Sequence, residues 1–292
     1  MKIGVMFASS SATDDTAIRE LVDVSEEVGI ESLWAVEHVF VPATLVSAYP
    51  YTDDGQVAGI DTAVLCDPVV WLSYVAGISR TLKLATGIMI LPQRNPAYVA
   101  KEWATLDRLS GGRAILGVGI GWMAEEMEAL GIAFSERAAR TDESIEAIRS
   151  LWADGPSTHE GRFHRWSEMI SLPKPAQTGG VPIVVGGHAP AAARRAARLG
   201  DGFFWPGSLT STIHAPGDDD ALVVLLDALR EECGRLGRNA ADVEVTVGAY
   251  RLTPDAVSRF EDLGVARITV GCPRPGDVRR RLEPLMASLA AS

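Results

Sequence analysis

The chain of 292 residues is long enough for one large α/β domain or two ordinary ones, and its hydrophobic content of 47% supports a sizeable core. A net charge of −11 argues against general binding of nucleic acid or of an anionic membrane surface. No apolar run approaches the length of a membrane span, and the first apolar stretch is too short for a signal peptide. We therefore expect a cytoplasmic protein with neither nucleic-acid nor membrane partners.

The cysteines and histidines do not predict a metal site. Cys66, Cys233 and Cys272 are far apart in the chain and odd in number, so they form neither a disulfide framework nor a ligand cluster. No two histidines have the spacing of a zinc site.

Short apolar runs alternate with helical patterns along the chain, which is typical of βα units on a parallel sheet. The first run, 2–7, precedes a helical pattern that Gly29 closes. Further strand candidates follow at 31–36, 82–90, 113–118, 181–187, 201–205, 243–248 and 266–271. Eight strands, nearly all followed by helices, favour a closed (β/α)8 TIM barrel over two open sheets. Because no linker divides residues 1–292, we predict a single domain.

Two segments exceed the minimal barrel. Residues 38–67 form a long excursion after the second strand, with little periodicity. Residues 155–180 have the pattern of a hairpin inserted before the fifth strand. Because barrel active sites are built from loops at the carboxyl ends of the strands, the excursion 38–67 is predicted to be a lid or specificity element.

Candidate functional residues follow the second strand and interrupt the third. Glu37 and His38 come directly after the second strand, and a neutral imidazole gains or loses a proton near pH 7. His38 is therefore a candidate acid/base or cofactor ligand, with a purely structural role as the alternative. Thr86, Gly87 and Ile88 lie late in the third strand, where a glycine marks a bulge or the close approach of a ligand.

Glycines also follow the fourth strand. Gly119 and Gly121 leave room for a planar ring at the barrel mouth, and Trp122 and Glu126 would border it. The spacing lacks the third glycine of a dinucleotide fingerprint, which argues against a Rossmann site. Glu125 and Glu126 have a second interpretation, as ordinary acids of a first helical turn.

Gly186, Gly187 and His188 lie between the fifth strand and a helix. Backbone N–H groups at a helix N-terminus bind anions, although packing alone also explains the two glycines. Further along the same helix, the arginines at 194, 195 and 198 are interpreted as a solvated face.

The motifs around these residues resemble the luciferase-like monooxygenase superfamily and, within it, the oxidoreductases that use the deazaflavin coenzyme F420. The similar segments cover most of residues 1–205 in the family's order. They are WAVEHVFVP, ATGIMILPQRNP, AKEWATLDRLSGGRAILGVGIGW, PKPAQ and VGGHAPAAARRAARLGDG. The resemblance implies a barrel that binds a flavin or deazaflavin at its mouth, with His38 near the ring.

The resemblance also implies roles for particular positions. A non-prolyl cis peptide would join Gly87 and Ile88 behind the ring, and the cofactor phosphate would bind at 186–188. One departure concerns Trp122. The sugar-phosphate dehydrogenase branch of the family has a catalytic glutamate at that position, so oxidation of glucose 6-phosphate is not expected here.

Three functions follow from the resemblance. The first is an oxidoreductase that transfers a hydride between coenzyme F420 and an unidentified small organic substrate. The second is an FMN-dependent two-component monooxygenase supplied by a separate reductase. The third, from another class, is a non-catalytic protein that carries the cofactor. The family's relatives also lead us to expect a homodimer.

Overall fold

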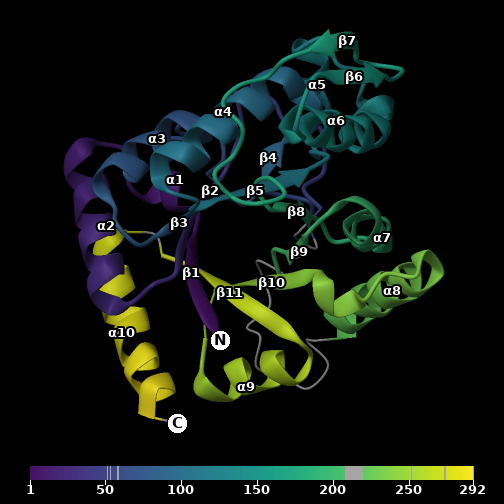
Figure 1. The fold of residues 1–292 in the computed structure, drawn as a ribbon. Helices are drawn as coiled ribbons and strands as arrows, with labels where there is room; N and C mark the ends of the chain where they lie inside the picture. Colours follow the sequence, from purple (N-terminus) through teal and green to yellow (C-terminus); the bar gives the residue numbers. More distant parts are fainter. Residues whose placement is uncertain are drawn as a thin grey trace.

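A closed parallel barrel of eight strands forms the centre of the molecule (Figure 1). The computed structural model describes residues 1–50, 52, 54–57, 59–207, 220–250, 252–272 and 274–291. The barrel closes because β11 pairs with both β10 and β1. Its strands are β1 (Lys2–Met6), β2 (Ser32–Ala35), β3 (Lys83–Thr86), β5 (Ala114–Gly119), β8 (Ile183–Gly186), β9 (Gly202–Trp205), β10 (Glu244–Ala249) and β11 (Val265–Gly271). The predicted (β/α)8 TIM barrel is confirmed.

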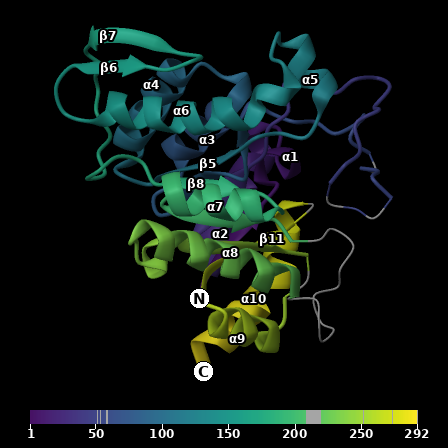
Figure 2. The same cartoon turned by 90° about the vertical axis from the view of Figure 1, so that its right-hand side faces the viewer.

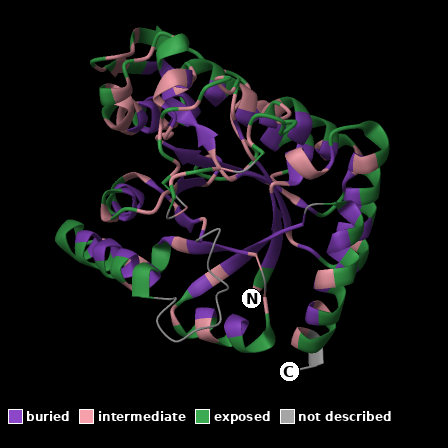
Figure 3. Cartoon of the chain, turned by 180° about the vertical axis from the view of Figure 1, so that it is seen from behind, coloured by how far each residue is buried: buried purple, intermediate pink, exposed green. Residues whose placement is uncertain are grey.

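Helices surround the barrel, with their buried faces on the strands and their exposed faces outward (Figure 3). Within the described part of the chain, no helix has the length and apolarity needed to cross a membrane. The helices are α1 (Ala8–Ser11), α2 (Asp15–Val28), α3 (Pro68–Ile78), α4 (Pro96–Ser110), α5 (Ala124–Ala129), α6 (Arg137–Trp152), α7 (Pro190–Leu199), α8 (Asp220–Leu236), α9 (Pro254–Asp262) and α10 (Pro275–Ala291), with short 3-10 turns at Leu91–Gln93, Phe134–Glu136 and Ala240–Asp242.

Local sequence sets the ends of these helices. The Asn95 side chain accepts a hydrogen bond from the backbone N–H of Ala97 and so caps the N-terminus of α4. Gly29 ends α2 and Gly111 ends α4, with φ angles of 83° and 71°. Both angles lie in the left-handed region that glycine adopts without steric cost. The βα units therefore begin and end where the sequence indicates.

The third strand is not continuous, as predicted for 82–90, but divided. After β3, a cis peptide joins Gly87 to Ile88, and the chain resumes as β4 (Met89–Ile90), which pairs with β5. The Thr86 hydroxyl donates to the Gly117 carbonyl at 2.7 Å and ties the end of β3 to β5. The single strand at 82–90 is thus interrupted, but the bulge indicated by Gly87 and the cis peptide implied by the family resemblance are confirmed.

Both expected insertions are present. Residues 155–180 contain the antiparallel hairpin β6 (Ser157–Glu160) and β7 (Arg165–Met169), which lies beyond α6 on the outside of the barrel (Figure 1). The excursion 38–67 has no helix or strand among its described residues, and positions 51, 53 and 58 lie outside them. In Figure 2 the excursion runs at the edge of the molecule beside α5.

The barrel interior is layered from its amino end to its carboxyl end. At the amino end, Arg267 forms ion pairs with Glu31 and Glu244. Above it, the rings of Trp34 and Phe204 lie 5.2 Å apart within an apolar cluster. A packed, salt-bridged base therefore supports whatever binds at the carboxyl end.

Candidate active site

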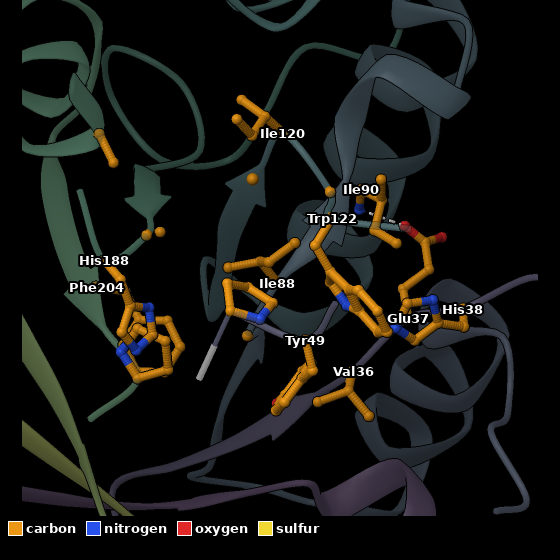
Figure 4. Close-up of a pocket in the computed structure, with 18 of the residues that line it drawn as sticks. Val36, Glu37, His38, Tyr49, Ile88, Ile90, Ile120, Trp122, His188 and Phe204 are labelled. Carbon is orange, nitrogen blue, oxygen red and sulfur yellow. Dashed lines mark hydrogen bonds between the residues drawn. The ribbon is translucent and has the colours of Figure 1, made fainter. Parts of the chain in front are cut away.

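A pocket of about 730 Å³ opens at the carboxyl ends of the barrel strands. This volume lies within the usual range for small-molecule sites. Its walls come from the ends of the strands, from the start of α6 and α7, and from the excursion 38–67. Figure 4 shows His188 and Phe204 on one side of the pocket and His38 and Trp122 on the other, with Ile88 between them.

Most of the predicted site residues line this pocket. The lining includes Glu37, His38, Gly87, Ile88, Gly119, Gly121, Trp122, Gly186, Gly187 and His188. Thr86 and Glu126 do not line it. Thr86 is fully buried and bonds to β5, whereas Glu126 contacts the pocket indirectly, through His38.

His38 is held by a buried carboxylate. Its Nδ1 lies 2.8 Å from Oε2 of Glu126, whose side chain is fully buried. Because a carboxylate accepts, Nδ1 carries the proton, and Nε2 is the ring nitrogen left for the pocket. Oε1 of Glu126 also accepts from the backbone N–H of Val39 at 2.6 Å. Although burial opposes ionisation, the bond from His38 and the charge of its ring keep the pKa of Glu126 below its ordinary value. One carboxylate thus fixes both the ring and the start of the excursion.

The neighbouring Glu125 fastens the excursion a second time. Its Oε1 accepts from the backbone N–H groups of Val46 and Ser47 at 2.7 and 2.9 Å, and its Oε2 accepts from the Ser47 hydroxyl at 2.6 Å. The Ser47 hydroxyl oxygen in turn accepts from the backbone N–H of Ala124 at the start of α5. These bonds, led by that from Ser47, lower the pKa of Glu125 to about 2. The two glutamates are therefore more than ordinary first-turn acids, because both fasten the excursion to α5.

Glu37 braces the bulge rather than facing a ligand. Its carboxylate accepts from the backbone N–H of Ile90 at 2.5 Å and from Nε of Arg94 at 2.6 Å, as the first of these bonds shows in Figure 4. Arg94 also pairs with Asp67 at the end of the excursion. The Ile90 N–H and the Arg94 guanidinium therefore occupy the Glu37 carboxylate.

The glycines at the barrel mouth make room for Ile88. A Cβ atom on Gly119 would lie 2.7 Å from Cδ1 of Ile88, and one on Gly186 would lie 2.6 Å from its Cγ2. Neither distance is tolerated by real side chains. The space expected for a planar ring beside Gly119 is thus filled by Ile88, which itself lines the pocket.

The opposite end of the pocket lies at the N-terminus of α7. Nε2 of His188 donates to the Gly207 carbonyl at 2.7 Å, and burial lowers the pKa of His188 to about 4. His188 is therefore neutral at neutral pH. The interpretation of Arg195 as solvated was wrong, because Arg195 is buried, lines the pocket and pairs with Asp142 of α6, which packs against α7.

Arg137, a pocket residue that sequence reasoning missed, begins α6. Its guanidinium lies over the ring of Phe134, 3.7 Å from the centroid, and donates to the Phe134 carbonyl. No carboxylate in the described part of the chain pairs with it, and its buried Nε has no hydrogen-bond partner there. Burial lowers its pKa. Nothing in the local pattern distinguishes this arginine from its many exposed counterparts.

Comparison with models of protein families identifies the family of this chain. A family model described as luciferase-like monooxygenase matches residues 1–256. The chain belongs to this family. The match covers the excursion, the bulge and the α7 end of the pocket, so the resemblance predicted from the motifs is confirmed.

Relatives within the luciferase-like family extend along most of the chain. An uncharacterised protein of Mycobacterium tuberculosis, Rv0940c, is 33% identical over 281 residues, covering 96% of this chain and 93% of that protein. An F420-dependent glucose-6-phosphate dehydrogenase of Kineococcus radiotolerans is 33% identical over 227 residues, covering 76% of this chain and 60% of that enzyme. Among solved structures, an F420-dependent secondary alcohol dehydrogenase with an F420–acetone adduct has a TM-score of 0.77 at 19% identity, covering 99% of this chain and 98% of that one. This last likeness concerns the fold.

Proposed function

We propose that this luciferase-like protein is an oxidoreductase that transfers a hydride between coenzyme F420 and a small organic substrate. The observation that carries the proposal is the polarity of one pocket. Arg137 at the start of α6 and the N-terminus of the adjoining helix α7 are suited to an anion, and His38 on Glu126 is suited to proton exchange. The F420-dependent dehydrogenase among the relatives supports the same cofactor.

The described residues fit a deazaflavin or flavin with a phosphorylated tail. The unpartnered Nε of Arg137 is a buried cationic donor in the pocket wall, which an anionic phosphate would satisfy. The N-terminus of the ten-residue helix α7 would add the positive end of its dipole. Ile88 would support the ring from below. When bound, F420 supplies a carbon that accepts or donates a hydride and does not react with oxygen as flavins do.

The chain's own part in the reaction is proton management. In the reducing direction, His38 would deliver a proton from Nε2 to the substrate atom that becomes negative as its neighbouring carbon receives the hydride. Glu126 keeps the ring orientation and the Nδ1 proton fixed. Trp122 and the excursion would exclude water from this end.

An FMN-dependent monooxygenase is the second candidate, favoured by the description of the matching family model. The anion-binding end would serve the FMN phosphate equally well, and such an enzyme would need oxygen and a separate reductase. A non-catalytic carrier is the third. A homodimer and a cytoplasmic location stay predictions.

Oxygen dependence separates these candidates. The protein is loaded with reduced F420 without oxygen, carbonyl compounds are added, and the visible absorbance of oxidised F420 is followed. The proposal expects turnover that needs an acceptor and is unchanged by air. Turnover only with reduced FMN and oxygen would instead support the monooxygenase, and binding without turnover of any acceptor would support the carrier. Either of these two results would contradict the proposal.

A further inference from the structure

We propose that the half of the pocket beneath the excursion accepts an uncharged substrate with an apolar body, and that Trp122 is the residue that determines this selectivity. The inference rests on the proposed function and names the substrate class that the site would take. It concerns the end of the pocket opposite α7, where His38 and Trp122 lie (Figure 4).

Apolar and aromatic side chains build this half. The lining residues that come from the second strand end, the bulge and the excursion are, apart from Glu37 and His38, uncharged. The larger ones are Val36, Tyr49, Val57, Ile60, Leu65, Ile88 and Ile90, and Trp122 joins them from the segment after β5. A surface of this kind gains free energy by covering apolar ligand area.

The acidic groups in and behind this half are already occupied by the protein. Glu37 accepts from Ile90 and Arg94, and Glu126 accepts from His38 and Val39. Neither carboxylate is available to pair with a cationic substrate. His38 keeps a ring nitrogen, Nε2, that is not bonded to Glu126 and can exchange a proton with a substrate.

The cationic side chains in the pocket lining come from outside the second strand end, the bulge and the excursion. Arg137 and Arg195 belong to α6 and α7, which pack against each other, and Arg195 is paired with Asp142. Arg94 does not line the pocket and is paired with Glu37 and Asp67. A substrate carboxylate or phosphate beneath the excursion would therefore lose its hydration without an arginine or lysine from these segments to pair with it.

Trp122 places the apolar wall directly beside the proton-exchanging group. Its ring meets His38 edge-on, with centroids 5.8 Å apart at 82°, and meets Tyr49 edge-on at 5.0 Å and 72°. A substrate atom that reaches Nε2 of His38 must therefore lie against these rings. Because Glu125 and Glu126 fasten the excursion that carries Tyr49, the wall is positioned before a substrate binds.

Hydride and proton exchange at this wall define the substrate class. The reacting carbon gives or receives the hydride, and an attached oxygen gives or receives the proton at His38. An uncharged ketone or secondary alcohol with a ring or branched apolar body meets both requirements. A sugar phosphate meets neither the charge nor the polarity of the wall.

A matched pair of ligands tests the inference. The F420-loaded protein is titrated calorimetrically with β-tetralone and with its ring-carboxylated analogue, which differ in one charge. We expect the uncharged ketone to bind at least about tenfold more tightly, because the carboxylate would be buried without a partner. Equal or tighter binding of the carboxylate, or no binding of either compound, would overturn the inference.

Variants assign the effect to Trp122. Trp122→Ala should weaken ketone binding about tenfold or more, whereas Trp122→Phe should retain most of it, since a ring remains. The matched control is Trp166→Phe, because Trp166 lies on the hairpin β7 outside the pocket and should change nothing. Unchanged ketone binding in Trp122→Ala, with folding verified by circular dichroism, would contradict the assignment.

This experiment distinguishes a failure of the proposed function from a failure of the substrate inference. Binding of F420 is measured on the same samples before any ketone is added. Loss of F420 binding by the unmodified protein contradicts the proposed function, and the ligand pair is then titrated into the cofactor-free protein. Retained F420 binding with a preference for the carboxylate contradicts only the substrate inference.

Discussion

At the scale of a single residue, Arg137 combines three properties: it lies in the pocket wall, its buried Nε has no partner, and no carboxylate of the described residues forms an ion pair with it. A charge-assisted hydrogen bond to a phosphate contributes about 1.5–3 kcal/mol. Arg137→Met should therefore weaken F420 binding by roughly 10- to 100-fold. The measurement is a fluorescence titration, with Arg194→Met on the exposed face of α7 as control. An unchanged dissociation constant would remove Arg137 from the cofactor site.

His188 leads to a prediction about pH. Burial lowers its pKa to about 4, so the unfolded chain takes up a proton below the ordinary value of 6.5 while the folded chain does not. Stability contributed by neutral His188 is thus complete above pH 6.5 and lost as the pH falls towards 4. The expected loss at about pH 5 is on the order of 1–2 kcal/mol.

The measurement is thermal unfolding between neutral and mildly acidic pH. His188→Gln is the matched variant, because its amide still offers a donor to the Gly207 carbonyl but does not titrate. The wild-type protein should lose more stability than this variant over the window. If the wild-type protein and His188→Gln lost equal stability as the pH fell, His188 would not be the group responsible.

Sequence reasoning found residues at strand ends but not their partners. His38 and Gly187 were predicted because each follows a recognisable apolar strand and faces the barrel mouth. The bond between His38 and Glu126 joins positions 88 residues apart, and Arg137 begins a helix with no side-chain cap to mark it. Such pairs depend on how α5 and α6 pack, which no local pattern contains.

The excursion 38–67 is the element whose behaviour depends most on a few bonds. The Glu125 carboxylate accepts from the Ser47 hydroxyl and from two backbone N–H groups of the excursion, and the Ser47 hydroxyl oxygen accepts from the backbone N–H of Ala124. Ser47→Ala or Glu125→Ala should speed amide hydrogen exchange across residues 39–47, since this part of the excursion would open locally more often. The barrel amides should exchange as before.

Glu128→Ala is the control for the hydrogen-exchange measurement on the Ser47 and Glu125 variants, because Glu128 is exposed on the same helix α5. Its exchange profile should match that of the wild-type protein, and all three variants should unfold within about 0.5 kcal/mol of it. If residues 39–47 exchanged as slowly in the Ser47 and Glu125 variants as in the wild-type protein, other contacts would hold the excursion.

Whole elements were easier to predict than their irregularities. Each barrel strand is buried on both faces, so it reads as a near-continuous apolar run between Gly- or Pro-marked turns. The hairpin 155–180 was also visible in its composition. The apolar run alone does not show the break between β3 and β4, because Met89 and Ile90 continue it beyond Ile88; Gly87 and the family resemblance indicated that break.

The whole barrel depends on the ion pairs that close its amino end. Arg267 of β11 is buried and bridges Glu31, before β2, to Glu244 of β10. Arg267→Met should cost about 2–3 kcal/mol in the free energy of unfolding, less than a fully buried pair because both glutamates are partly exposed. Urea denaturation measures this loss.

The same variant separates stability from function. The pocket lies at the carboxyl end of the strands, so the folded Arg267→Met protein should bind F420 as the wild type does. Reduced affinity in fully folded protein would indicate that the base of the barrel and its mouth are coupled.

For the whole molecule, the central claim is that the protein binds coenzyme F420. A direct titration tests this claim. The purified protein is titrated separately with coenzyme F420 and with FMN, and the quenching of cofactor fluorescence is followed. The account predicts micromolar binding of F420 and FMN binding at least about tenfold weaker. Tighter binding of FMN, or binding of neither cofactor, would contradict it.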